Sequence, residues 1–356
     1  MDRKTETIDI NQPWPENGIE NVDKCPVCRS LDKVLLYDGL KDRVFFCAPG
    51  EWKLWRCKSC SSAYLDPRPT KETIGLAYRH YFTHETTFNK PIKELSLWKR
   101  FRRTLANGYR NYKSGSNLHP ASKIGIALTL FPDQRHILDS SLRGIEKSNP
   151  VNQRLLDIGC GNGDFLYFAK STGREVVGID LDEEAVSVAR KNGLDVRLGN
   201  IDVLNPEKEK FDIITIGHVI EHVHDPLYLL RKCYGLLNKS GYVWIDTPNI
   251  DSEGHRIYGR NWGDLDPPRH LALFSYNSLR NVLRDAGFSK IQDQPYRPLC
   301  KDTFQSSEAI LKREDPYNKL YHFSNELRLN IKKAKIVSRY EPVKREYITI
   351  KAWRFD

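Results

Sequence analysis

Strand-like and helix-like stretches alternate over the second half of the chain. Short runs rich in Val, Ile and Leu are each followed by a segment with helical periodicity or by a glycine turn. This alternation is typical of an open α/β sheet whose strands are joined by helices. The predicted strands are 155–158, 175–179, 195–198, 211–216, 242–245, 289–292 and 346–353.

A glycine-rich turn follows the first strand, within Leu155–Phe165 (LLDIGCGNGDF). A strand, a tight turn and a helix in this order bring backbone N–H groups against a ligand at the carboxyl end of the strand. A dinucleotide fingerprint requires a further glycine where this chain has Asp164, so a nicotinamide cofactor is disfavoured. Asp180, at the end of the second strand, can accept hydrogen bonds from both hydroxyls of an adenosine ribose.

The motif D-x-G-x-G-x-G, at positions 157–163, resembles that of the class I S-adenosylmethionine-dependent methyltransferases. The resemblance covers roughly residues 150–300 and the last strand, and it implies S-adenosyl-L-methionine as cofactor. It also implies a Rossmann-like seven-stranded α/β sheet with strand seven antiparallel. Adenine would be read by Asn200 or Asp202, and the segment after the fourth strand would line the sulfonium. The cofactor-binding residues implied are Asp157, Gly159, Gly161, Gly163, Asp180, Asn200, Ile201 and His218.

The chain has 356 residues, a hydrophobic fraction of 39% and a net charge of +10. The basic balance permits an acidic partner such as nucleic acid, anionic lipid or a sugar nucleotide, and equally a solvated basic surface. The first residues, MDRKTETIDINQPWPENG, lack an apolar signal core, and no stretch approaches the ~18 apolar residues of a membrane span. A cytoplasmic location is expected.

Two C-x-x-C pairs, Cys25–Cys28 and Cys57–Cys60, predict one structural Zn²⁺ site with four thiolate ligands, against free or redox-active thiols as the alternative. Candidate hairpin strands between them, 34–37, 44–46 and 52–56, would bring the pairs together. The predicted metal ligands are Cys25, Cys28, Cys57 and Cys60. A helix capped by Thr70 is expected next, and its Tyr78 and Tyr81 could reach the substrate or pack the module onto the catalytic domain.

The segment 67–150 is predicted to be a helical connection or a lid. Trp98–Arg103 (WKRFRR) is basic, and Ile124–Phe131 (IGIALTLF) is apolar but too short to cross a bilayer. The two could lie on a membrane surface as an amphipathic helix. Burial of 124–131 as an ordinary core fragment is favoured.

The stretch HVIEH after the fourth strand contains His218, Glu221 and His222. A metal site is disfavoured here, because this spacing is not H-E-x-x-H. Glu221 is adjacent to His222 and would lie on a different helical face from the general base of that motif. Glu221 and His222 are instead expected to hold the cofactor edge and the start of a helix.

The block Tyr258–Ser275 contains D-P-P-R-H-L-A-L-F-S, which resembles a segment of bacterial sugar and polysaccharide-linked methyltransferases. Relatives that methylate sugar carbons carry Glu-His where this chain has Arg269-His270, so C- and O-methylation both stay open. Methyl transfer requires a positioned nucleophile and a proton acceptor, and imidazole suits that task at neutral pH. His270 is therefore predicted to be the base, with Arg269 and Arg260 holding a phosphate or carboxylate of the substrate. The alternative is a histidine that only stabilises the loop and an arginine in a surface ion pair.

Together these patterns predict a zinc-ribbon-like module (1–66), a helical connection (67–150) and a methyltransferase domain (151–356) with a helical insertion at about 303–340. The expected catalytic residues are His270, Arg269, Glu221 and His222. The expected substrate is a sugar nucleotide or glycan precursor, and a homodimer is a further expectation. The alternatives are an RNA methyltransferase and a non-catalytic scaffold that retains the fold.

Overall fold

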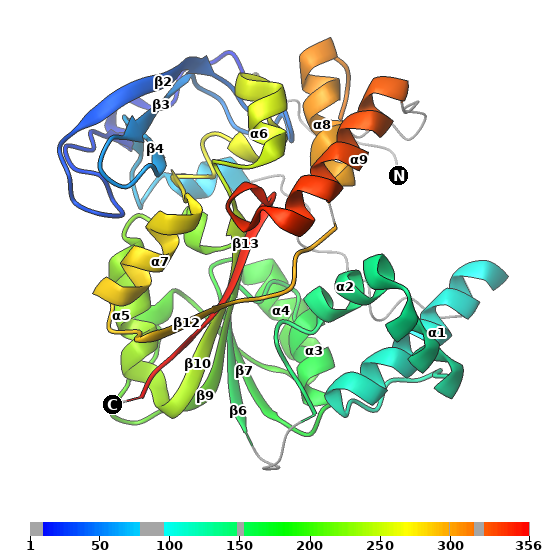
Figure 1. Cartoon of the computed structure of the whole chain (residues 1–356). Coiled ribbons are helices and arrows are strands. Elements are labelled where there is room, and N and C mark those ends of the chain that lie inside the picture. The colour runs from blue at the N-terminus through cyan, green and yellow to red at the C-terminus, as the bar shows by residue number, and fades with distance from the viewer. Residues whose placement is uncertain (1–9, 79–95, 148–152, 299, 317–323, 356) are drawn as a thin grey trace.

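The computed structural model describes residues 10–78, 96–147, 153–298, 300–316 and 324–355, which form two lobes, one above the other in Figure 1. The lower lobe contains a seven-stranded sheet in the order β12-β13-β10-β9-β6-β7-β8, and only β13 runs antiparallel to its neighbours. The predicted fold class is therefore confirmed. The strands are β6 (Arg154–Ile158), β7 (Glu175–Asp180), β8 (Asp195–Leu198), β9 (Phe211–Gly217), β10 (Leu237–Pro248), β12 (Lys290–Asp293) and β13 (Tyr347–Trp353).

Helices cover both faces of this sheet. One apolar cluster joins the strands to α5 (Pro226–Leu236) and α7 (Tyr276–Asp285), and another joins them to α3 (Asp164–Lys170) and α4 (Glu183–Lys191). Burial of the central strands on both faces explains their continuous runs of Val, Ile and Leu. Ser275 caps α7 in a capping box with Ser278, which fixes the start of this helix.

The upper lobe contains a four-stranded sheet in the order β11-β4-β3-β2, made of β2 (Lys33–Leu40), β3 (Trp52–Cys57), β4 (Ala63–Leu65) and β11 (Ala272–Leu273). A further strand pair joins β1 (Ile19–Glu20) to β5 (Arg68–Pro69). The predicted strands 34–37 and 52–56 are confirmed, but a strand at 44–46 is wrong. The Asp42 carboxylate accepts the backbone N–H groups of residues 44, 45, 47 and 48, and these bonds curl the segment into a turn.

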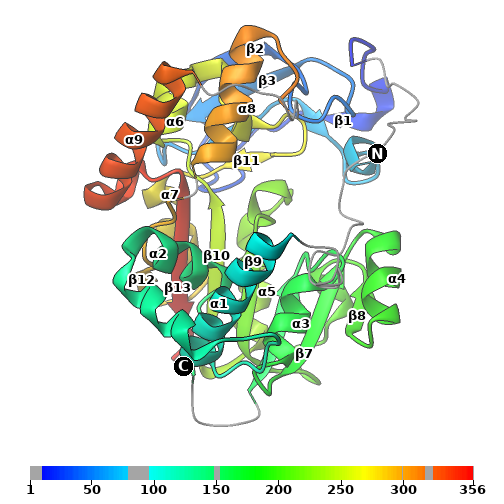
Figure 2. The ribbon, with the colours of Figure 1, turned by 90° about the vertical axis from the view of Figure 1, so that its right-hand side faces the viewer.

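The core of the upper lobe is built from both ends of the chain. Strand β11 pairs with β4, so the sheet extends across the domain boundary predicted at residue 66. Trp52 and Leu54 pack with Trp262 and with Phe304. The predicted helical insertion exists as α8 (Lys301–Lys312) and α9 (Asn325–Tyr340), which together with α6 (Glu253–Tyr258) lie over this core (Figure 2). These helices contribute buried side chains such as Phe304 and Leu327 to this core.

The connection between the lobes contains α1 (Leu97–Ser114), the 3-10 helix η4 (Lys123–Leu130) and α2 (Pro132–Ser141). The predicted burial of 124–131 is wrong, because Ile124 is 74% and Leu130 is 78% exposed. Gly125 is the position that faces α1, and a Cβ there would lie 2.1 Å from the Leu105 carbonyl oxygen. This close approach of the two backbones turns the larger side chains of η4 outward.

The segment after β5 forms a 3-10 turn, η2 (Ile74–Tyr78), where a longer helix capped by Thr70 was expected. Tyr78 is the last residue of this turn, and Tyr81 lies outside the described residues. Among the helices that the structure describes, none combines the length and the apolar character needed to cross a bilayer.

Candidate active site

The glycine turn lies between β6 and α3 at the carboxyl edge of the sheet. Gly159, Gly161 and Gly163 all have positive φ, a conformation that favours glycine. A Cβ on Gly159 would lie 2.3 Å from Cγ2 of Val219, so the turn touches the segment that follows β9. A Cβ on Gly161 would meet nothing within 4 Å, which leaves this backbone open to a ligand.

Two carboxylates, Asp180 and Asp157, lie near the glycine turn. Asp180 accepts the Gly161 N–H at 2.7 Å, and burial raises the pKa of this aspartate. Asp157 is fully buried, and its Oδ1 accepts hydrogen bonds at 2.6 Å from both Arg143 and Thr215. Burial also raises the pKa of Asp157. Asp180 is therefore placed at the turn itself, whereas Asp157 fixes Arg143 beside it, a contact that the sequence motif does not reveal.

The predicted adenine end lies after β8. The side chain of Asn200 caps its own turn by accepting the Asp202 N–H at 2.8 Å, and Ile201 is packed in the core. Asp202 accepts hydrogen bonds from Tyr228 and pairs with Lys232 at 3.1 Å. These contacts hold Asn200 and Asp202 at the surface, and they favour neither residue as the one that binds adenine.

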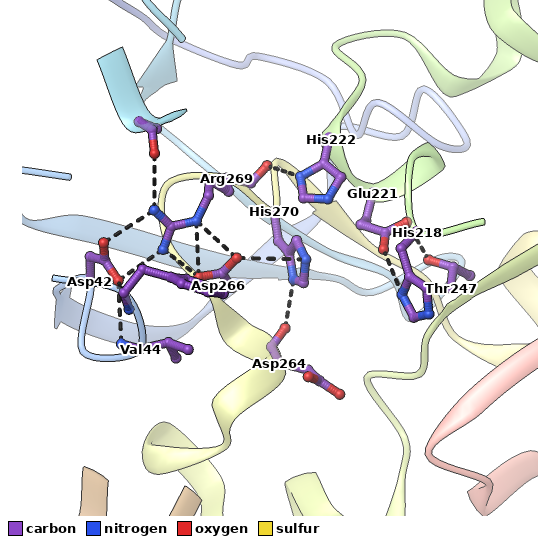
Figure 3. A network of polar contacts seen from close by, with 12 residues as sticks. Asp42, Val44, His218, Glu221, His222, Thr247, Asp264, Asp266, Arg269 and His270 are labelled. Carbon is purple, nitrogen blue, oxygen red and sulfur yellow. Dashed lines mark hydrogen bonds and ion pairs between the residues drawn. The ribbon is translucent and has the colours of Figure 1, made fainter. Parts of the chain in front are cut away.

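Glu221 lies in the short 3-10 turn η6 (Ile220–His222) that follows β9. Its side chain is fully buried, with Oε2 accepting the Thr247 hydroxyl at 2.9 Å and Oε1 3.5 Å from Nδ1 of His218 (Figure 3). Burial alone would raise the pKa of Glu221, but the contact with His218 and the nearby histidines lower it to about 2. Glu221 is therefore a carboxylate at neutral pH.

The rings of His222 and His270 are neighbours, with centroids 4.8 Å apart and planes tilted by 59°. Nδ1 of His222 lies 2.9 Å from the Arg269 carbonyl and 3.0 Å from the Tyr78 hydroxyl, and Nδ1 of His270 lies 2.7 Å from the Asp264 carbonyl. A carbonyl only accepts, so Nδ1 carries the hydrogen in both rings and Nε2 holds the lone pair. Burial, followed by the charge of His270, lowers the pKa of His222 to about 4.

Glu221, His222 and His270 form one cluster, each with a potential ligand atom within 4.8 Å of those of the other two. The cluster joins two loops that are 48 positions apart, held together by the Leu271 N–H, which donates to the Glu221 carbonyl at 2.8 Å. Such a group can accept a proton or bind a metal ion. His218 and His222 do not share a helical face, because η6 contains only residues 220–222.

Arg269 does not hold a substrate anion, and that prediction is wrong. Its side chain is completely buried, with Nη2 2.5 Å from Asp266 and 2.8 Å from Asp42, and with Nη1 donating to the Ala77 carbonyl (Figure 3). All of its donor directions point into protein, so this arginine joins the upper lobe to the loop that carries His270. Arg260 lies apart from it, donating to the Asp38 carbonyl at 3.0 Å.

The four predicted zinc ligands meet at one end of the upper lobe. Two similar turns bring the pairs into position, with the N–H of Arg29 bonded to the Cys25 carbonyl and that of Ser61 to the Cys57 carbonyl. The four ligand atoms lie within 4.8 Å of one another, with Sγ–Sγ distances of 3.8 Å for Cys25–Cys60 and 3.5 Å for Cys28–Cys57. Four tetrahedral Zn–S bonds of ~2.3 Å separate the sulfurs by about 3.8 Å, so the residues fit Zn²⁺.

The lower lobe has the sheet order and the glycine turn of a class I S-adenosylmethionine-dependent methyltransferase domain. Residues 133–293 match the family model described as "Methyltransferase domain", so this part of the chain is similar to that family.

Comparison with curated proteins gives relatives from the same class. The chain is 38% identical over 116 residues to the Ubiquinone biosynthesis O-methyltransferase of Actinobacillus pleuropneumoniae serotype 5b, covering 29% of this chain and 50% of the relative. It is 26% identical over 185 residues to the protein of that name from Nitrosomonas europaea, covering 48% of this chain and 77% of the relative. Apart from the latter, the chain spans about half the length of the curated relatives it matches.

Among solved structures, a SAM dependent methyltransferase from Archaeoglobus fulgidus aligns with a TM-score of 0.39 and 21% identity. The alignment covers 73% of this chain and 100% of that one.

Replacing Arg269 by Met should lower the free energy of unfolding by about 3–5 kcal/mol, because it leaves the buried carboxylates of Asp42 and Asp266 without their cation. Chemical denaturation measures this change. Arg260→Met, at an exposed arginine, is the matched control and should change stability by less than about 0.5 kcal/mol. Equal unfolding midpoints for the two variants would show that the buried pair does not stabilise the fold.

Proposed function

We propose that this protein transfers a methyl group from S-adenosylmethionine to a hydroxyl or a carbon of a sugar nucleotide or glycan precursor. One observation carries the proposal: Glu221 and His222, which form a cluster with His270, follow β9, the strand next to the one that leads into the glycine turn. Val219 contacts Gly159, so a cofactor on that turn has the cluster beside it. A proton acceptor and a methyl donor would then face the same space between the lobes.

The cofactor supplies an electrophilic methyl on a sulfonium that is already a good leaving group. The chain is left to orient the acceptor and to remove its proton. We assign the proton to Nε2 of His270, whose Nδ1–H is held by the Asp264 carbonyl at 2.7 Å. The Glu221 carboxylate would stabilise the imidazolium that results, and the hydroxyl of Tyr78 on His222 would extend this polar wall.

The acceptor class rests on the resemblance of the Tyr258–Ser275 block to sugar-type enzymes. A second candidate is a hydroxyl on a ubiquinone precursor, favoured by the names of the curated relatives. Both acceptors require deprotonation beside the methyl group. A screen of sugar nucleotides, glycans, phenolic precursors and RNA for a mass gain of one methyl distinguishes them.

His270→Ala should reduce turnover by about 10² or more while leaving cofactor affinity unchanged, because it removes the proton acceptor but not the glycine turn. Turnover is measured with the acceptor found in the screen, and affinity by calorimetry. His119→Ala, at a surface histidine that contacts Asn117, is the control. Near-normal turnover of the His270 variant would refute its role as base.

Asp180→Ala should weaken S-adenosylmethionine binding at least about tenfold, because a ribose hydrogen bond and the hold on Gly161 are lost together. Isothermal titration calorimetry gives the dissociation constant. Asp195→Ala, at an exposed position on β8, should bind normally. Unchanged affinity in the Asp180 variant would place the cofactor elsewhere.

We also propose that Cys25, Cys28, Cys57 and Cys60 hold one structural Zn²⁺, which leaves no open coordination position for chemistry. The purified protein should contain one zinc per chain, and Cys57→Ser should lose it and lower the unfolding temperature. Elemental analysis and thermal unfolding measure these effects. Cys233→Ala, at a buried thiol in α5, should keep the metal. A zinc-free wild-type protein with normal stability would contradict the assignment.

A further inference from the structure

One segment of this protein carries a large share of its positive charge. Residues 97–131 contain seven Lys and Arg and no Asp or Glu, so about a tenth of the chain carries seven of its ten net charges. The segment consists of α1, η4 and the loop between them. Such a local excess attracts an anionic partner more strongly than the overall charge suggests.

Large apolar side chains are exposed on the same elements. At the start of α1, Leu97 is 82% and Trp98 is 66% exposed, and Phe101 stacks on Trp98. On η4 and just after it, Ile124, Leu130 and Phe131 are exposed. We call the surface formed by these six side chains the α1–η4 face.

The two elements that carry these six side chains, α1 and η4, pack against each other. The Ser122 N–H donates to the Thr104 carbonyl at 3.1 Å, and a Cβ on Gly108 would lie 1.8 Å from the Ser122 carbonyl oxygen. Figure 1 shows α1 at the margin of the lower lobe, away from the upper lobe. A partner could therefore contact α1 and η4 together without entering the space between the lobes.

The basic side chains of α1 are placed to act with this face. Lys99, Arg100 and Arg102 alternate with Trp98 and Phe101. Within the described part of the chain no carboxylate forms an ion pair with these three cations. Their charge is thus available to an external anion.

The exposed aliphatic side chains indicate which anionic partner this face binds. Nucleic acid binds cations and stacks on aromatic rings, but the aliphatic side chains of Leu97, Ile124 and Leu130 make no favourable contact with phosphates or base edges. A bilayer binds aliphatic, aromatic and basic side chains alike. Aliphatic side chains enter the acyl boundary, Trp and Phe suit the interface, and Lys and Arg pair with anionic headgroups. The α1–η4 face and its neighbouring cations combine these three kinds of side chain.

We propose that the α1–η4 face binds the surface of an anionic lipid bilayer, with its apolar side chains at the headgroup boundary. The proposal is independent of the methyl acceptor. It assigns a docking role to elements that the cofactor and the cysteine cluster do not use.

Co-sedimentation of the full chain with lipid vesicles tests this docking. Vesicles of phosphatidylcholine with phosphatidylglycerol should bind the protein in low salt, and phosphatidylcholine alone should bind at least about tenfold less. Arg100→Gln with Arg102→Gln should weaken binding by about thirtyfold. Trp98→Ser with Phe101→Ser should weaken it at least about tenfold.

Matched controls lie on α9, a basic helix of the upper lobe that is separate from the α1–η4 face. Lys332→Gln with Lys333→Gln removes the same charge, and Ile336→Ser, 62% exposed in the wild type, removes a comparable side chain. Both should bind as the wild type does. Equal losses in the control and α1 charge variants would mean non-specific attraction and overturn the proposal.

Two further outcomes would also overturn it. One is tight binding of an RNA oligonucleotide, lost in the Trp98 and Phe101 variant, without vesicle binding. The other is a dimer, seen by light scattering, that this variant dissociates while the wild type ignores vesicles. Cofactor affinity is measured in parallel, so failure of lipid docking is distinguishable from failure of the proposed methyl transfer.

Discussion

The buried guanidinium of Arg269 ties the loop that carries His270 to the rest of the upper lobe, and the geometry of the candidate site depends on it. It pairs with Asp42 from the upper lobe and with Asp266 from its own loop, and it donates to the Ala77 carbonyl. A buried cation of this kind is tolerated only when its partners are complete, so the three segments must fold onto one another. Because His270 is the next residue, the same contacts fix the position of the imidazole relative to Glu221 and His222.

The cysteine module is connected to the candidate site through the loop that carries Arg269 and His270. Strand β11 begins two residues after His270 and completes the sheet of the upper lobe, so backbone pairing joins the module to the loop that carries His270. A metal site that holds β2, β3 and their turns would act on catalysis through position, since it contributes no open ligand. Its proposed role is to support the loop that carries the base.

The parallel sheet was predictable, because local features specify it: β-branched runs, the glycine turn and the serine cap of α7 are each contained in a few residues. The candidate cluster was not, because His222 and His270 approach through contacts of long sequence separation: the β4–β11 pairing, the Arg269 ion pair and the Leu271 N–H bond to the Glu221 carbonyl. The role of Arg269 was mistaken since an arginine in a polar loop has the same local signature whether it faces solvent or two buried carboxylates. The exposure of Ile124 and Leu130 was missed because an apolar run does not reveal which side a close backbone contact will occupy.

The account depends on a methyl donor bound over Gly161 with its sulfur facing the histidine pair. A crystal structure of the protein with S-adenosylhomocysteine tests this most directly. We predict that the ribose hydroxyls contact Asp180 and that the thioether sulfur points toward Nε2 of His270 across the space between the lobes. A product bound elsewhere, or with its sulfur turned away from that cluster, would contradict the account.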